Sequence, residues 1–113
     1  MIVTRLVQSV PVLDIRGAVI GTQPDSGLRR AVRAAVEQGA RVLVVNLAHV
    51  TTIDSSGVAD LAASHTMVAG RGGRLAFCNL TPKLKEVFGT TRLDTVLAIY
   101  ETEDDALAAV RPG

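Results

Sequence analysis

The sequence predicts a single α/β domain over residues 1–113, with a mixed, mostly parallel β-sheet, an antiparallel N-terminal edge strand and about four helices in the order ββαβαβαβα. Short β-branched segments alternate with segments whose apolar residues recur at helical spacing. Apolar residues make up 48% of the chain and aromatic residues only 3%, so Val, Leu, Ile and Ala must form a core between closely packed layers. A length of 113 residues suits one such core.

The first segment predicts a β-hairpin at one edge of the sheet. Residues 2–7 and 10–15 are two β-branched runs divided at Gln8 and Ser9, and Pro11 lies near the start of the second run. Because the connection is so short, the two strands must pair antiparallel. A stretch of turn-forming residues follows, with Gly17, Gly21, Pro24 and Asp25.

An amphipathic helix and a central strand come next. Apolar residues at helical spacing predict a helix that ends at Gly39; they are Leu28, Ala31, Val32, Ala35 and Val36. Residues 42–45 form a continuous apolar, β-branched run that is too short for a helix, which predicts a strand buried on both faces. Residues 46–56 are expected to form a loop that leaves this strand at its carboxyl end.

The second half of the chain continues the alternation. A second helix is expected to end at Gly70, with apolar residues at Val58, Leu61, Ala62 and Val68. Residues 75–78 predict another buried strand, and Thr81 with Pro82 predicts the N-cap and first position of a third helix. Residues 96–99 are expected to form the last edge strand. Thr102 is expected to cap a terminal helix with an acidic first turn.

Composition and charge exclude several classes of function. Twelve basic and eleven acidic residues are scattered along the chain, without the basic face that nucleic-acid binding needs. The single cysteine, Cys78, excludes an intrachain disulfide and a cysteine-ligated metal site, and it fits a reducing compartment. No apolar stretch approaches the roughly 18 residues of a membrane span, and no signal-peptide core is present. We therefore expect a cytoplasmic protein without a membrane span.

One segment carries residues suited to a regulatory role. Asp54, Ser55, Ser56 and Gly57 lie at the expected start of the second helix. Asp and Ser side chains there accept hydrogen bonds from the amides of the first turn, which explains them as helix caps. The same position also tolerates a phosphate, because the unpaired amides and the helix dipole both favour added negative charge. The segment is therefore either a cap alone or a cap that also presents a phosphoacceptor.

The chain resembles the STAS domain family, of the anti-sigma-factor antagonist type, along nearly its whole length. The resemblance is carried by residues 42–47, Val50 and residues 53–58, and further on by residues 72–75, residues 84–88, Leu93, Val96 and residues 100–107. These segments occur in the family's order and at matching spacing. The resemblance implies the α/β sheet fold expected above and a bacterial signalling protein that regulates transcription without being an enzyme and without a cofactor.

The resemblance also implies a switch. In these antagonists the hydroxyl directly after the Asp is phosphorylated, which here is Ser55, by an anti-sigma factor that is also a serine kinase. The unphosphorylated domain binds that factor and releases the sigma factor, and a serine phosphatase reverses the modification. Asp54 would orient the acceptor or contact the kinase, Ser56 would cap the helix, Gly57 would allow close approach of a partner, and Val58 completes the partner-binding segment. A homodimer is left open.

A second hypothesis keeps the fold and removes the switch. Residues 16–21 carry no carboxylate, whereas the family usually has an acidic turn there. The chain would then be a constitutive scaffold subunit of a sensory assembly or of a transporter complex. Val19 and Ile20 are expected to be exposed apolar residues suited to such an interface.

Other functions have weaker support. A hydrolase would need Ser55 with His49 or His65, yet the chain has no Gly-x-Ser-x-Gly motif, and His65 lies roughly 15 Å along the helix from Ser55. We expect His65 to be solvated. Two isolated histidines and one cysteine offer no metal-ligand spacing. The glycines of residues 70–73 follow a helix and precede a strand, the reverse of a phosphate-binding loop, so we interpret them as a helix stop and a turn.

Overall fold

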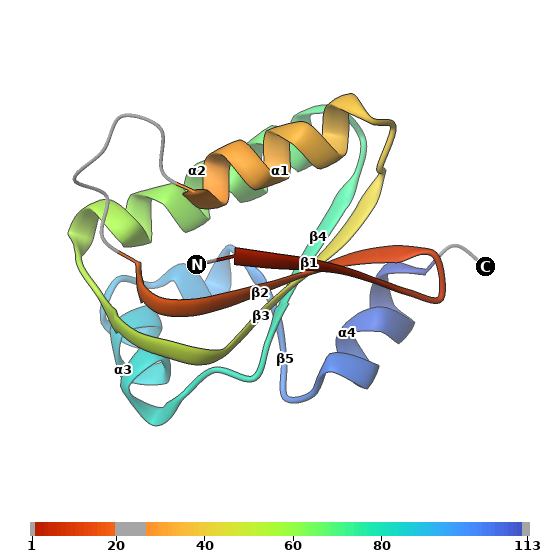
Figure 1. Ribbon diagram of the computed structural model, residues 1–113. Helices are drawn as coiled ribbons and strands as arrows, with labels where there is room; N and C mark the ends of the chain where they lie inside the picture. Colours follow the sequence, from red (N-terminus) through yellow and green to blue (C-terminus); the bar gives the residue numbers. More distant parts are fainter. Residues whose placement is uncertain (1, 20–26, 112–113) are drawn as a thin grey trace.

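The computed structural model describes residues 2–19 and 27–111. In these residues the elements alternate in the predicted order, with one short 3-10 helix (η1) added before the last strand (Figure 1). They are β1 (Ile2–Val7), β2 (Val10–Val19), α1 (Gly27–Glu37), β3 (Val42–Ile53), α2 (Ser55–Gly70), β4 (Arg74–Cys78), α3 (Pro82–Thr90), η1 (Leu93–Thr95), β5 (Ala98–Tyr100) and α4 (Glu103–Val110).

The strands form one sheet in the order β1-β2-β3-β4-β5, with β3 at its centre as predicted. Strand β1 pairs antiparallel with β2, and the other neighbours are parallel. The hairpin turn holds Gln8 at φ 53° and Ser9 at φ 68°. Two successive left-handed residues define a type I′ turn, whose twist matches that of the two strands it joins. The predicted mixed sheet with an antiparallel edge strand is therefore confirmed.

Helices cover both faces of the sheet. Helices α1, α2 and α3 bury their apolar residues against one face, together with Leu43 and Val45 of β3. Helix α4 covers the other face, where it packs on Val44 of the same strand. Figure 1 shows α1 and α2 on one side of the sheet and α4 on the other. Successive residues of β3 thus enter opposite cores, which explains its continuous apolar run.

Two strands are longer than the sequence pattern indicates. Strand β2 extends to Val19 and includes Gly17, which was expected in a turn, and β3 extends to Ile53. The predicted loop over residues 46–56 is therefore wrong, because most of it is strand. The two extensions pair with each other in parallel, with an irregular register near Gly17. The expected turn residues Gly21, Pro24 and Asp25 lie outside the described residues.

The last strand begins later than predicted. Leu93 and Leu97 bury their side chains, and the amides of Val96 and Leu97 both donate to the carbonyl of Leu93. This tight turn occupies the backbone groups that a strand over residues 96–99 would need, so β5 begins only at Ala98. The predicted caps of the last two helices are confirmed. Thr81 accepts from the amide of Leu84, and Thr102 accepts from the amide of Asp105.

Cys78 is fully buried at the end of β4, as expected of a small core residue. Burial, reinforced by the nearby carboxylates of Glu103 and Asp14, raises the pKa of its thiol to about 12. At pH 8 we expect the Cys78 thiol of the native protein not to react with Ellman's reagent over hours. In the denatured protein the same thiol should react at once. Rapid labelling of the native protein would contradict the burial of this side chain.

Candidate functional site at the start of helix α2

The predicted regulatory segment lies where the central strand β3 ends and α2 begins. Asp54 is the N-cap residue of α2, with an extended backbone, and its Oδ1 accepts a hydrogen bond from the amide of Gly57 at 2.7 Å. The amide of Val58 donates to the carbonyl of Asp54 at 2.9 Å and closes the first helical turn. Ser55 is therefore the first residue of the helix, at the positive end of its dipole.

The two serines of this turn are exposed, while the residues on either side of them are partly or fully buried. Among the residues that the structure describes, none forms a hydrogen bond with the hydroxyl of Ser55. Asp54 is half-buried and Gly57 is buried, and Val58 packs against the main core. The fold thus presents two neighbouring hydroxyl groups to solvent from a fixed backbone.

The helix cap is Asp54, not Ser56 as expected from the sequence. The N-cap side chain must come from the residue just before the first helical turn, where the backbone is still extended. Asp54 has that backbone, with φ −109° and ψ −178°, whereas Ser56 is already inside the helix. The hydroxyl of Ser56 is consequently not required by this cap.

Gly57 is buried and serves internal packing, so the close approach that it allows in this structure is to the chain's own β2. A Cβ atom at this position would lie 2.1 Å from the carbonyl oxygen of Val19 and 2.9 Å from Cγ1 of Ile53. The same carbonyl accepts the amide of Asp54 at 3.3 Å. Val19 is itself buried, which corrects its expected exposure, and Ile20 lies outside the described residues. The start of α2 is therefore held tightly against the end of β2.

Comparison with known proteins identifies the family. The model of the STAS domain matches residues 1–106. The chain belongs to the STAS domain family. Over 65 residues it is 26% identical to the anti-sigma F factor antagonist of Paenibacillus polymyxa, in an alignment that covers 58% of this chain and 56% of that protein. The chain thus spans about half the length of this curated relative.

Solved structures show the same fold. An anti-sigma factor antagonist from Mycobacterium paratuberculosis is 28% identical, with a TM-score of 0.84 over 99% of this chain and 94% of that one. Unphosphorylated SpoIIAA, an anti-sigma factor antagonist, is 21% identical, with a TM-score of 0.74 over the full length of both chains. The phosphorylated form of SpoIIAA, a Bacillus cell fate determinant, gives a TM-score of 0.70 at 21% identity, over 98% of this chain and all of that one.

The STAS fold places the other candidate catalytic residues away from a common centre. His49 is exposed on β3. His65 lies on α2 and is only partly exposed, and its Nδ1 is buried with no hydrogen-bond partner among the described residues, so the expectation of a solvated side chain is wrong. Within the same residues, no group of three or more His, Cys, Asp or Glu side chains could hold a metal ion. None of the described helices has the length and apolar character needed to span a membrane.

Two buried polar residues on α2 were not identified from the sequence. Asp60 and Ser64 lie one turn apart and are buried among the apolar residues of the helix. A carboxylate oxygen of Asp60 lies 2.9 Å from Nε of Arg29 on α1. Their spacing from Gly57 and Val68 places them on the buried face of α2, and polar residues on that stripe were the available signal. This ion pair joins α1 to α2, the helix that carries the candidate site.

A second polar group anchors α4 to the opposite face. Nε of Arg5 on β1 lies 2.5 Å from a carboxylate oxygen of Asp14 on β2, and Nη2 lies 2.5 Å from Oε1 of Glu103. The side-chain amide of Asn46 on β3 donates to the same oxygen of Glu103 at 3.1 Å. Hydrogen bonds to Asp14 and Glu103 raise the pKa of Arg5 above its ordinary value. The sequence does not reveal this group, because its members are far apart along the chain.

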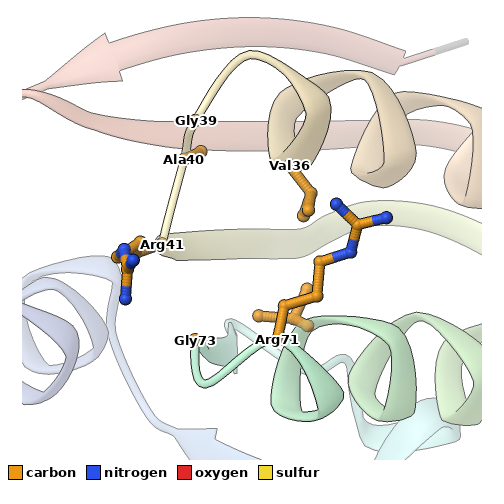
Figure 2. Close-up of a pocket in the computed structure, with 7 residues that line it drawn as sticks. Val36, Gly39, Ala40, Arg41, Arg71 and Gly73 are labelled. Carbon is orange, nitrogen blue, oxygen red and sulfur yellow. The ribbon is translucent and has the colours of Figure 1, made fainter.

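The glycine-rich turn after α2 lies at the opposite end of this helix from Ser55, since a helix of 16 residues is about 24 Å long. A hollow of about 170 Å³ opens there between Val36, Arg41, Arg71 and Gly73. Figure 2 shows the side chain of Arg71 extending toward Val36, while Arg41 points away from it. The amide of Gly73 donates to the carbonyl of Val68 at 2.9 Å. The turn therefore ends the helix, as predicted, and does not offer this amide to a phosphate.

Proposed function

We propose that this chain is an anti-sigma-factor antagonist whose binding to an anti-sigma factor is switched off by phosphorylation of Ser55. The observation that carries the proposal is the hydroxyl of Ser55, exposed at the first position of α2 directly after the Asp54 cap. The relatives named as anti-sigma factor antagonists support the choice of partner. The solved phosphorylated form of SpoIIAA, although its low identity shows only the fold, is consistent with a switch.

The position of Ser55 suits a reversible modification. A phosphoryl group there would add about −1.5 to −2 charges beside the positive end of the α2 dipole, where negative charge is stabilised. Both serines of the turn are exposed, so a kinase could reach Ser55 without local unfolding. The Asp54 cap and the Gly57 contact would hold the backbone of α2 in place. The modification would then change the charge of the surface and leave the fold intact.

The partner-binding surface in this proposal comprises Asp54, Ser55, Ser56 and Val58. Gly57 contributes by allowing the helix to start here, because it is buried against Val19. A docked partner would desolvate the hydroxyl of Ser55, and an added dianion in that interface would have to be buried or repelled. The anti-sigma factor would be a serine kinase, and a serine phosphatase would restore the binding form.

The site of phosphorylation can be tested with a matched pair of serines. Each purified serine-kinase anti-sigma factor of the source organism is assayed against the wild type, Ser55→Ala and Ser56→Ala. We expect the cognate kinase to phosphorylate the wild type and Ser56→Ala but not Ser55→Ala. Intact-protein mass spectrometry measures the stoichiometry. Phosphorylation of Ser55→Ala to the same extent as the wild type would remove Ser55 from the role.

The binding consequence can be tested with the same kinase. Ser55→Asp is expected to weaken binding by at least about tenfold, equivalent to about 1.4 kcal/mol, while Ser55→Ala binds as the wild type does. Ser56→Asp is the matched control for an added charge on the same turn and should have the smaller effect. Calorimetry measures each dissociation constant. Two results together would favour the constitutive scaffold instead: Ser55→Asp binds the anti-sigma factor as tightly as the wild type, and no kinase phosphorylates the wild type.

A further inference from the structure

The outer edge of β1 is open in the part of the chain that the structure describes. Among the described strands, β1 pairs only with β2, and Figure 1 shows it at the edge of the sheet. Leu6 is 74% exposed and Val3 is 39% exposed, and both are large apolar residues of this one strand. An edge strand with exposed apolar residues is a template for pairing with another strand.

Two of the usual protections of an edge strand, a proline and a bulge, are missing from β1. The strand has no proline, and its register with β2 runs from Ile2–Ile15 to Val7–Val10 without a bulge. Its one charged residue, Arg5, is held by Asp14 and Glu103 and is thereby drawn over the sheet. Strand β5, at the other edge, has only three residues and is too short to pair along the whole of β1.

The hairpin determines which backbone groups face outward. A two-residue type I′ turn closes on a hydrogen-bonded pair, here Val7 and Val10, and hydrogen-bonded pairs then alternate along the ladder. Val3, Arg5 and Val7 accordingly direct their amide and carbonyl groups toward β2. The backbone groups of Ile2, Thr4 and Leu6 point to the open edge.

We propose that β1 binds a second copy of this chain, by antiparallel pairing of the two β1 strands about a two-fold axis through Thr4. The axis is perpendicular to the sheet, so the sheets of the two copies join into one and each face of the sheet runs from one copy into the other. The side chains of two paired residues must therefore point to the same face. This register places Thr4 opposite Thr4 and Ile2 opposite Leu6. All outward-facing backbone groups of Ile2, Thr4 and Leu6 then find partners.

Side chains favour this register over its neighbour. It places the exposed Leu6 against Ile2, which is partly buried beside α1. A hollow of about 610 Å³ adjoins Leu6 between β1 and the end of α1. Moving the axis to Arg5 would place two arginines opposite each other and would leave Ile2 without a partner in β1. A formal net charge of +1 adds little repulsion between the copies.

The proposal does not depend on the function proposed above, and the full chain can test it. We expect the wild type to shift from monomer to dimer with rising concentration in sedimentation velocity. Thr4→Pro removes the outward amide at the axis without touching the ladder to β2, and it should raise the dimer dissociation constant at least about tenfold. Thr4→Val keeps that amide and should dimerise as the wild type does. Leu6→Lys should also weaken the dimer.

Amide hydrogen exchange separates this interface from any other. On dimerisation the amides of Thr4 and Leu6 should become protected, while those of Val3, Arg5 and Val7 keep the protection they have in the monomer. Circular dichroism and thermal unfolding check that each variant is folded. A wild type that stays monomeric at near-millimolar concentration would overturn the proposal, as would a dimer that survives both Thr4→Pro and Leu6→Lys or that leaves the amides of Thr4 and Leu6 unprotected.

Discussion

Gly57→Ala should destabilise the protein by about 3 kcal/mol or more. The added Cβ would lie 2.1 Å from the carbonyl oxygen of Val19, closer than any non-bonded contact allows. The backbone sets the position of the Cβ, and the oxygen belongs to the backbone, so no side-chain rotation can relieve the overlap. The start of α2 would have to move away from β2, and the hydrogen bond from Asp54 to Val19 would lengthen or break. Urea unfolding followed by circular dichroism measures the loss.

Gly70→Ala is the matched control, because Gly70 lies at the other end of the same helix and a Cβ there would contact nothing within 4 Å. We expect it to be neutral or to stabilise the protein by up to about 1 kcal/mol, since alanine favours the helix and restricts the unfolded chain. A Gly57→Ala protein as stable as the wild type would show that α2 does not start so close to β2. The contrast thus tests the local packing that presents Ser55.

Arg5→Ala should cost about 2–3 kcal/mol. The side chain of Asp14 is only 9% exposed, and Arg5 forms a two-pronged contact with it at 2.5 and 2.9 Å. Without Arg5, a nearly buried carboxylate loses its cation, and Glu103 retains only the amide of Asn46. We expect α4 to loosen from the sheet as well. In the Arg5→Ala protein, the amides of α4 should exchange with deuterium faster than in the wild type, and this increase should exceed that of the α2 amides.

Two comparisons make this prediction specific. Lys85→Ala removes an ion pair to Glu101 at 3.5 Å whose side chains are 55% and 79% exposed, and it should cost no more than about 0.5 kcal/mol. Replacing both members of the pair, with Arg5→Met and Asp14→Leu together, should recover part of the loss because the nearly buried carboxylate of Asp14 is then removed along with its cation. If Arg5→Ala lowered the free energy of unfolding no more than Lys85→Ala does, the burial of the Asp14 carboxylate would not require Arg5.

Much of the fold could be predicted because its signals are local. Apolar spacing identified α1 and α2, and side-chain caps at Thr81 and Thr102 identified the starts of α3 and α4. The hairpin followed from two β-branched runs joined by two residues. In each case, the residues that form the element are also neighbours in the sequence.

The candidate site could be predicted in part. An Asp followed by two serines before an apolar helix indicated exposed hydroxyls at a helix start, and the structure has Ser55 and Ser56 there. The role of each neighbour needed the coordinates. Asp54 rather than Ser56 is the cap, and Gly57 packs against the end of β2.

The sequence alone therefore determined the fold class, the order of elements and the position of the serines, since these depend on periodicity and capping within a few residues. Tertiary structure decided the length of β2 and β3, the pairing of Arg5 with Asp14 and Glu103, and the burial of Asp60. These features depend on contacts between distant segments. Such contacts form only when the sheet brings the segments together, and no local pattern records them.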